Sequence, residues 1–548
     1  MSASRALYRS AGLVGGLTLL SRLTGMIQGR VLAQFLGQGW ASDAFFVAYR
    51  LPNLLRRFAA EGTMTSALIP SISETEAESG EAAAQDMVAR FLGTLGLLLA
   101  LFCALAILGM SALTGLQMLG RLAPDAGLAG QFQALGQVLA GSRPAPEGLA
   151  LTTLLARIMF PYLALMSLTA GLAAVLNLRG RFGLPASVST FGNLAVMAVV
   201  LAAMYLGPTS WRDPVRATVV CAVAFIAAGF LQFAVLWPSF QRLGFGLRWG
   251  LFLGHPGVLR ILKRMGPGLL GTGIHPINVV ISTAIASQLP AGAQTVLFHS
   301  NLMGELVLGL FSASLATVSL PAMSRQADAG DLDGLRGSLS SALRATALLA
   351  LPASVGLAVL AKPIIALIFQ SGRYGETAVA WTASTIPYQA IGLLFVATSR
   401  ITVQSLYALK DYRSPALGAL LGFCVNIPLS WFLMQRLGTG GIALANGLAS
   451  MVGLAFVTGA LHLALDRLPY RAVLRGWGLF ALASVAMGAL AWYGARLSGA
   501  LVFHSTLGTA LRLLPLIALC GLFYFGLLRL LRVREARDIQ DALLRRLR

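Results

Sequence analysis

The stretch SDAFFVAYRLPNLLRRFAAEG, residues 42–62, sets charged side chains into a run that is otherwise apolar. On a helix, four of its charged residues fall within about 40° of one another, and they are Asp43, Arg50, Arg57 and Glu61. Asn53 lies about 60° to one side of this face, and Arg56 projects about 100° away from it. The stretch therefore predicts a helix with one continuous polar stripe.

The rest of the chain predicts that this helix lies in a membrane. Of the 548 residues, 57% are hydrophobic and 11% are charged, whereas a soluble domain carries about 25% charged residues. Apolar runs long enough to cross about 30 Å of hydrocarbon recur from one end to the other. We expect an all-α polytopic membrane protein with about 14 transmembrane helices. The expected spans are 13–36, 44–70, 90–115, 152–176, 186–207, 216–238, 266–289, 297–323, 340–361, 379–404, 413–434, 440–463, 474–495 and 507–531.

The net charge of +21 fits a membrane protein better than a nucleic-acid partner. With both termini in the cytoplasm, about 25 Lys and Arg residues lie inside and about 9 outside, as the positive-inside rule requires. The longest outer loop is then 117–150, which is rich in Gly, Ala and Pro. We expect a multi-pass protein of the bacterial inner membrane that binds no nucleic acid.

A short series of motifs occurs twice along the chain. Pro161-Tyr162, Pro185 and Asn193 follow one another in the same order as Pro387-Tyr388, Pro415 and Asn426. Motifs this short also recur by chance, but internal repeats are typical of transporters, whose site lies where the repeats meet. The expected divisions are an N-terminal lobe at 1–240, a C-terminal lobe at 241–465, two further helices at 466–532 and a basic cytoplasmic tail at 533–548.

The intramembrane charges are the functional signal, because each costs several kcal/mol unless it faces a cavity or a partner. Arg22 lies about halfway along the first span and shares a face with Gly25. Arg50 lies close enough to a helix end to reach the interface instead. Arg56, Arg57 and Glu61 could pair internally, but two cations for one carboxylate leave a surplus. Surplus guanidinium groups suit a phosphate, which they bind in bidentate fashion.

No enzyme constellation, metal site or cofactor site is visible in the sequence. The five histidines are scattered without the spacing of metal ligands. In the second half, Glu305 is the carboxylate of the eighth span, with Asn301 one turn before it. A sodium site made of carboxylates is therefore not expected there.

The stretch from Ser42 to Pro70 resembles the MurJ (MviN) family of lipid II flippases, within the multidrug/oligosaccharidyl-lipid/polysaccharide exporter superfamily. Further matches to the family are Ser21-Arg22 with Gly25, Arg157 with Phe160-Pro161-Tyr162, Asn177 with Phe182 and Pro185-Ala186, Met265-Gly266-Pro267, and Leu320-Pro321. They are spread over most of the chain, and the expected number of spans agrees with the family.

The resemblance implies two six-helix lobes in a V around a cationic cavity, with two C-terminal helices forming a groove for a lipid tail. It implies that a monomer among membrane lipids carries lipid II, which is undecaprenyl-pyrophosphate-linked MurNAc-pentapeptide-GlcNAc, from the cytoplasmic to the periplasmic leaflet for peptidoglycan synthesis. Arg22, Asp43, Arg56 and Glu61 match positions that the family uses in or near the cavity. The full expected substrate-binding set is Arg22, Asp43, Arg50, Asn53, Arg56, Arg57, Glu61, Asn301 and Glu305.

The sequence departs from the family at two cationic positions. The family's first helix continues to an Arg-Asp pair where this chain has Gln28 and Gly29, and an arginine expected shortly before Glu305 is replaced by Asn301 and Leu302. Two alternatives therefore stay open: a flippase for another lipid-linked oligosaccharide, and a divergent membrane scaffold that does not transport. Export of small organic cations is disfavoured, because the polar stripe has more cations than anions.

Overall fold

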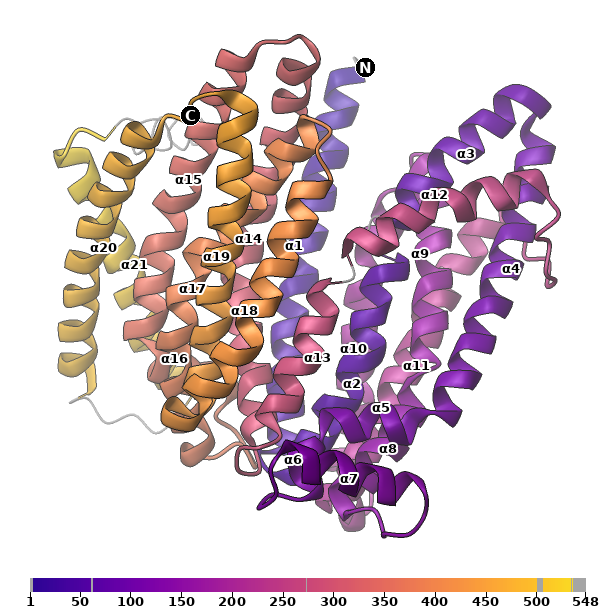
Figure 1. Ribbon diagram of the computed structural model, residues 1–548, viewed down its shortest axis with the longest axis horizontal. Coiled ribbons are helices and arrows are strands. Elements are labelled where there is room, and N and C mark those ends of the chain that lie inside the picture. The colour runs from indigo at the N-terminus through magenta and orange to yellow at the C-terminus, as the bar shows by residue number, and fades with distance from the viewer. Residues whose placement is uncertain (1–2, 61–62, 273, 500–505, 534, 536–548) are drawn as a thin grey trace. The chain divides into compact units, whose positions relative to one another are not determined.

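The computed structural model describes residues 3–60, 63–272, 274–499, 506–533 and 535. Every named element in this part of the chain is a helix (Figure 1). The chain divides into two compact units: Met1–Thr295 with Ser371–Gly375, and Val296–Gln370 with Glu376–Arg548. The expected basic tail at 533–548 lies outside the described residues except for Val533 and Glu535.

The first unit contains the helices α1 to α13. Their bounds are α1 Ala3–Leu36, α2 Trp40–Ala60, α3 Thr63–Ser79, α4 Glu81–Leu108, α5 Met110–Gln117, α6 Leu119–Leu122, α7 Leu128–Leu139, α8 Glu147–Met159, α9 Tyr162–Leu178, α10 Gly183–Tyr205, α11 Pro214–Gln241, α12 Pro256–Thr272 and α13 Ile274–Ala286. A large core forms where α3, α4, α9, α11 and α12 meet, around the fully buried side chains of Phe91, Leu172, Leu176, Phe240 and Ile261. Although the expected division at 240 places them in the other lobe, α12 and α13 contact helices of this unit.

The second unit contains most of α14 and all later helices. Their bounds are α14 Ala293–Asp328, α15 Leu332–Val359, α16 Ala361–Phe369, α17 Glu376–Ala408, α18 Arg413–Leu437, α19 Thr439–Leu465, α20 Tyr470–Gly499 and α21 Thr506–Leu530. The helices α17 and α19 approach so closely that a Cβ placed on Gly447 would lie 2.7 Å from the Cα of Gly392. Small residues permit such close backbone packing between membrane helices.

Ten helical segments of the described chain are long and apolar enough to cross a membrane. They coincide with the expected spans from 90–115 to 216–238 and from 340–361 to 507–531. The four other expected spans, 13–36, 44–70, 266–289 and 297–323, are not in this set, so the number 14 stays a prediction. Two of the four contain residues outside the described part of the chain, which are 61–62 in the span 44–70 and 273 in the span 266–289.

The segment 117–150, expected as a loop, contains the helices α6 and α7 at one end of the first unit (Figure 1). The helix α7 buries Gln131 and Leu135, and it exposes Leu128 and Phe132. Its glycines and alanines suggested a loop, but the periodic spacing of its larger apolar residues is helical.

Charged residues near the C-terminal end of α3 form a group of ion pairs within the first unit. Glu74 accepts from Arg264 at 2.9 Å and from Arg260 at 3.4 Å, which ties α3 to α12. Arg179 pairs with Glu76, and Arg248 pairs with Asp86 at 2.5 Å. Several arginines that follow the positive-inside rule are thus neutralised by carboxylates nearby in the fold.

The tyrosines of the two motif copies have similar neighbours in their own units. A Cβ placed on Gly229 of α11 would meet the ring of Tyr162 of α9 at 2.9 Å. In the second unit, a Cβ placed on Gly440 of α19 would meet the ring of Tyr388 of α17 at 2.5 Å. In both units a tyrosine ring therefore lies against a glycine two helices further along the chain.

Candidate functional site

The expected polar stripe begins at the start of α2, where the backbone is capped locally. The hydroxyl of Ser42 accepts a hydrogen bond from the amide of Gly39 at 2.9 Å, as one half of a capping box does. Ser42 also bonds the hydroxyl of Thr295 at 3.0 Å. These contacts fix the first turn of α2, and with it the next residue, Asp43.

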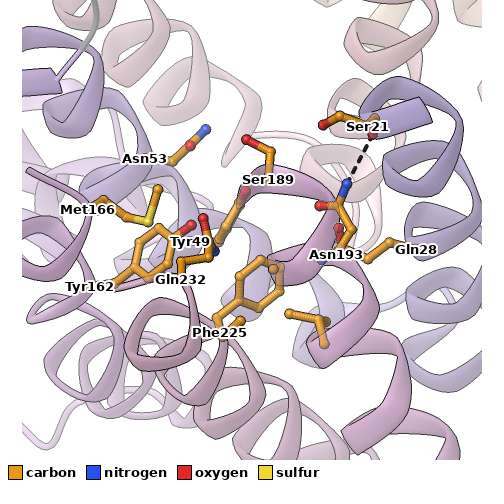
Figure 2. Close-up of a pocket in the computed structure, with 13 residues that line it drawn as sticks. Ser21, Gln28, Tyr49, Asn53, Tyr162, Met166, Ser189, Asn193, Phe225 and Gln232 are labelled. Atoms are coloured by element: carbon orange, nitrogen blue, oxygen red, sulfur yellow. Dashed lines mark hydrogen bonds between the residues drawn. The ribbon is translucent and has the colours of Figure 1, made fainter. Parts of the chain in front are cut away.

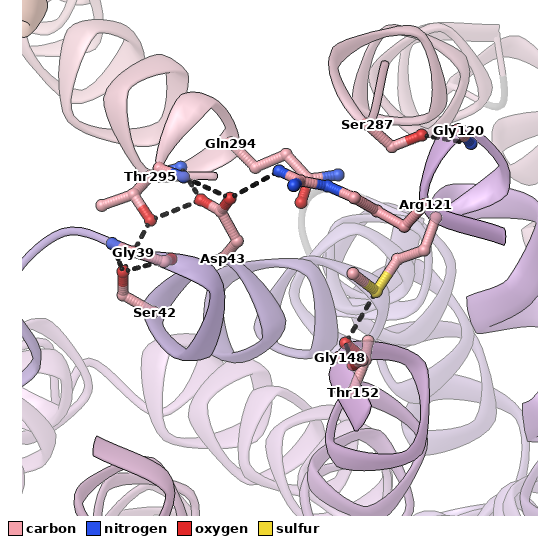
Figure 3. A network of polar contacts seen from close by, with 12 residues as sticks. Gly39, Ser42, Asp43, Gly120, Arg121, Gly148, Thr152, Ser287, Gln294 and Thr295 are labelled. Carbon is pink, nitrogen blue, oxygen red and sulfur yellow. Dashed lines mark hydrogen bonds and ion pairs between the residues drawn. The ribbon is translucent and has the colours of Figure 1, made fainter. Parts of the chain in front are cut away.

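Asp43 is 1% exposed and is surrounded by donors (Figure 3). Its carboxylate accepts from the amide of Gly292 at 2.7 Å, from the amide of Thr295 at 2.8 Å and from the Thr295 hydroxyl at 2.7 Å. Arg121 donates to it at 3.3 Å. The carboxylate therefore caps the amino terminus of α14, where backbone amides and the helix dipole favour a negative charge.

The described ionic partner of Asp43 is Arg121 of α6, a residue that the sequence did not single out. Arg121 was missed because a single arginine in a predicted outer loop gives no signal of its own. Whether Asp43 also meets cargo stays a prediction.

Arg50 follows Asp43 by two helical turns and is 8% exposed. Its guanidinium donates to the hydroxyl of Thr283 of α13. It is therefore held inside the first unit, and its depth in the membrane stays a prediction. Asp43 and Arg50 together direct the polar face of α2 toward α13 and the start of α14.

The remaining charged residues of the stripe cannot be placed. The side chains of Arg56 and Arg57, and the whole of Glu61, lie outside the described residues. Their predicted roles stay predictions.

Arg22 lies in the middle of α1 and is partly buried. Within the described part of the chain, its guanidinium has no hydrogen-bond or ion-pair partner. On the same face, a Cβ placed on Gly25 would lie 3.4 Å from the amide nitrogen of Asn193 on α10. Asn193 donates to the carbonyl of Ser21 at 3.0 Å, so α10 packs against the backbone directly beside Arg22.

Asn53 lines a partly open cavity of about 150 Å³ within the first unit (Figure 2). The lining side chains come from α1, α2, α9, α10 and α11, and they include Gln28, Tyr49, Asn53, Tyr162, Asn193, Phe225 and Gln232. Sequence reasoning found Asn53 but missed Gln232, because it weighed charged residues in the membrane and passed over single neutral amides.

Asn301 and Glu305 lie on α14 in the second unit. The side-chain oxygen of Asn301 accepts from Gln389 of α17 at 3.1 Å, and both Asn301 and Glu305 are exposed. Two residues before Asn301, His299 is 1% exposed and its ring centroid lies 4.6 Å from that of Phe369. The described residues contain no group of three His, Cys, Asp or Glu side chains that could hold a metal ion.

Residues 32–514 match the family described as lipid II flippase MurJ. A probable lipid II flippase MurJ of Vibrio cholerae serotype O1 is 31% identical over 551 residues, which cover 99% of each chain. A lipid II flippase MurJ of Burkholderia cenocepacia is 30% identical over 448 residues, 81% of each chain.

The similarity extends to solved structures. A lipid II flippase MurJ in an inward closed conformation has a TM-score of 0.72, at 20% identity over 95% of this chain and 99% of its own. An inward-facing multidrug resistance MATE family transporter of the MOP superfamily has a TM-score of 0.63, at 12% identity over 83% of this chain and 99% of its own. At these identities the similarity shows a shared fold.

Proposed function

The chain belongs to the lipid II flippase MurJ family, and from that premise we propose that it carries lipid II across the bacterial inner membrane by alternating access. The cargo moves from the cytoplasmic to the periplasmic leaflet, and both termini lie in the cytoplasm. The protein works as a monomer of about 14 spans and catalyses no covalent step.

The environment of Arg22 supports this proposal independently of family membership. A partly buried guanidinium without a described partner is costly in a membrane unless it faces water or a ligand. A guanidinium stays protonated and binds phosphate oxygens in bidentate fashion, which suits the pyrophosphate of a lipid-linked sugar.

The other predicted residues complete the proposed cycle. Arg56 and Arg57 would hold the pyrophosphate with Arg22, and Glu61 would pair with them when the cavity is empty. Asp43 and Arg50 support the site by holding α2 against α13 and the start of α14. Asn53, Asn301 and Glu305 would contact the uncharged part of the cargo. Outward movement of the anionic lipid gains about 2.3 kcal/mol per charge for each 100 mV of inside-negative potential.

Complementation of a strain depleted of its own flippase tests the role of Arg22. The wild-type chain is expected to restore growth, and Arg22→Ala is expected to abolish it at an unchanged protein level. Arg143→Ala, which removes an exposed arginine after α7, is the matched control and is expected to complement fully. Full complementation by Arg22→Ala would defeat the proposed role of this arginine.

A flippase for a different lipid-linked oligosaccharide is the second candidate. Gln28, which replaces a family arginine, lines the cavity of the first unit as a neutral side chain, and this favours a cargo with a different head group. Competition in reconstituted vesicles separates the two candidates, because lipid II must outcompete other lipid-linked sugars if it is the cargo.

A further inference from the structure

The cavity in the first unit is built to hold a neutral, hydrogen-bonding group. None of the described residues that line it is charged. A pyrophosphate in this cavity would have no counter-ion among these residues, and a buried charge without a counter-ion is costly. The cavity therefore differs in chemistry from the arginines proposed to hold the pyrophosphate.

Three amide side chains in the cavity have no partner among the described residues of the protein. Among the described residues, none hydrogen-bonds to the side chains of Gln28, Asn53 or Gln232, and Gln28 and Gln232 are only 9% and 4% exposed. An amide carries two donors and an acceptor, and a buried amide that lacks partners costs free energy. These groups are therefore available to a ligand that offers both donors and acceptors.

Aromatic rings form another part of the lining. The ring centroid of Phe225 lies 4.7 Å from that of Tyr49 and 6.4 Å from that of Tyr162. Figure 2 shows Gln232 beside these rings, with Asn53 on one side and Gln28 on the other. A site of this kind combines apolar ring surface with a few polar groups that orient the ligand.

The size of the cavity limits what it can enclose. A volume of about 150 Å³ is comparable to that of a protein cavity that binds benzene, so a larger sugar ring would enter in part and extend through the open side. A sugar ring offers hydroxyl groups to amides and C–H faces to aromatic rings, and an N-acetyl substituent pairs with an amide as both donor and acceptor. We propose that this cavity binds one N-acetylated sugar ring of the cargo, a proposal that rests on the proposed function as a carrier of lipid-linked sugars.

Binding of two lipids to the full-length protein in nanodiscs tests the proposal. The lipids are lipid II and undecaprenyl pyrophosphate, which lacks the sugars and the peptide that they carry. Gln232→Leu is expected to weaken lipid II binding about tenfold and to leave undecaprenyl pyrophosphate binding unchanged. Gly192→Ala is a second variant, because its Cβ would lie 2.1 Å from the Gln232 amide nitrogen and would push this flexible group into the cavity.

Gln117→Leu is the matched control. Gln117 is also a buried glutamine of the first unit, with neither side-chain polar atom bonded, but it does not line the cavity. It is expected to leave the binding of both lipids unchanged. The sugar site would be overturned if Gln232→Leu and Gly192→Ala weakened the binding of both lipids equally, or if they weakened the binding of neither lipid. Both results would leave the proposed flippase function in place. Failure of the wild-type protein to bind either lipid would overturn the proposed function and the sugar site with it.

Discussion

At the scale of single residues, Asp43 shows how a charge in a membrane protein is accommodated. Its carboxylate faces two backbone amides, a hydroxyl and a guanidinium, all within the first unit. Hydrogen bonds to an ionised acceptor are about twice as strong as those between neutral groups. The negative charge also neutralises the positive end of α14. Asp43 is therefore expected to matter for stability independently of cargo.

Asp43→Asn is expected to destabilise the protein by about 1–3 kcal/mol, because its amide nitrogen would face either the donors of Thr295 or those of Gly292 and Arg121. The measurement is the apparent midpoint of thermal unfolding in detergent. Asp213→Asn is the control, since Asp213 caps α11 through the amides of Val215 and Arg216 at an exposed position. Equal midpoints for wild type and Asp43→Asn would show that the carboxylate is not a structural cap.

At the scale of helices, the contact between α17 and α19 depends on two glycines that touch. Gly447→Ala places a Cβ 2.7 Å from the Cα of Gly392. This Cα is a backbone atom, so it cannot rotate away as a side chain can. Overpacking of this kind costs about 1–3 kcal/mol, so a lower unfolding midpoint is expected. Gly459→Ala in the same helix has nothing within 4 Å of its new Cβ and is expected to be neutral or slightly stabilising. Similar midpoints for the two variants would contradict this packing.

The ion pairs between α3 and α12 are expected to depend on pH. The hydrogen bond from Arg264 lowers the pKa of Glu74 below its usual value of 4.5. Because the folded-state pKa is depressed, the stabilisation is complete above pH 4.5 and is lost as the pH falls through the lower, folded-state value. Both partners are partly exposed, so the effect is small and is also reduced by salt.

Hydrogen exchange of residues 256–265, corrected for the intrinsic effect of pH, measures this contact. Exchange of this segment is expected to rise on acidification below pH 4.5, and Glu74→Gln is expected to show the faster exchange already at neutral pH. Asp125→Asn, at an exposed carboxylate between α6 and α7, is expected to behave as wild type. If Glu74→Gln exchanges like wild type at neutral pH, this ion pair does not hold α12.

At the scale of the whole molecule, long apolar runs were predictable and side-chain partners were not. Spans such as 216–238 and 413–434 match α11 and α18 closely, because apolar length alone defines a helix in a membrane. Asp43 was recognised as a functional candidate, but its partners Arg121 and Thr295 lie 78 and 252 residues away in sequence. Gln232 was missed because a neutral amide in an apolar run becomes informative only when its neighbours are known.

The central claim is that this chain moves lipid II to the outer leaflet and that Arg22 is required for the movement. The most direct measurement is the accessibility of lipid II to an enzyme that acts only from outside, in cells that depend on this chain alone. We predict that lipid II becomes inaccessible when the chain is depleted, and that it stays inaccessible when Arg22→Ala is expressed at the wild-type level. Unchanged accessibility after depletion would contradict the account.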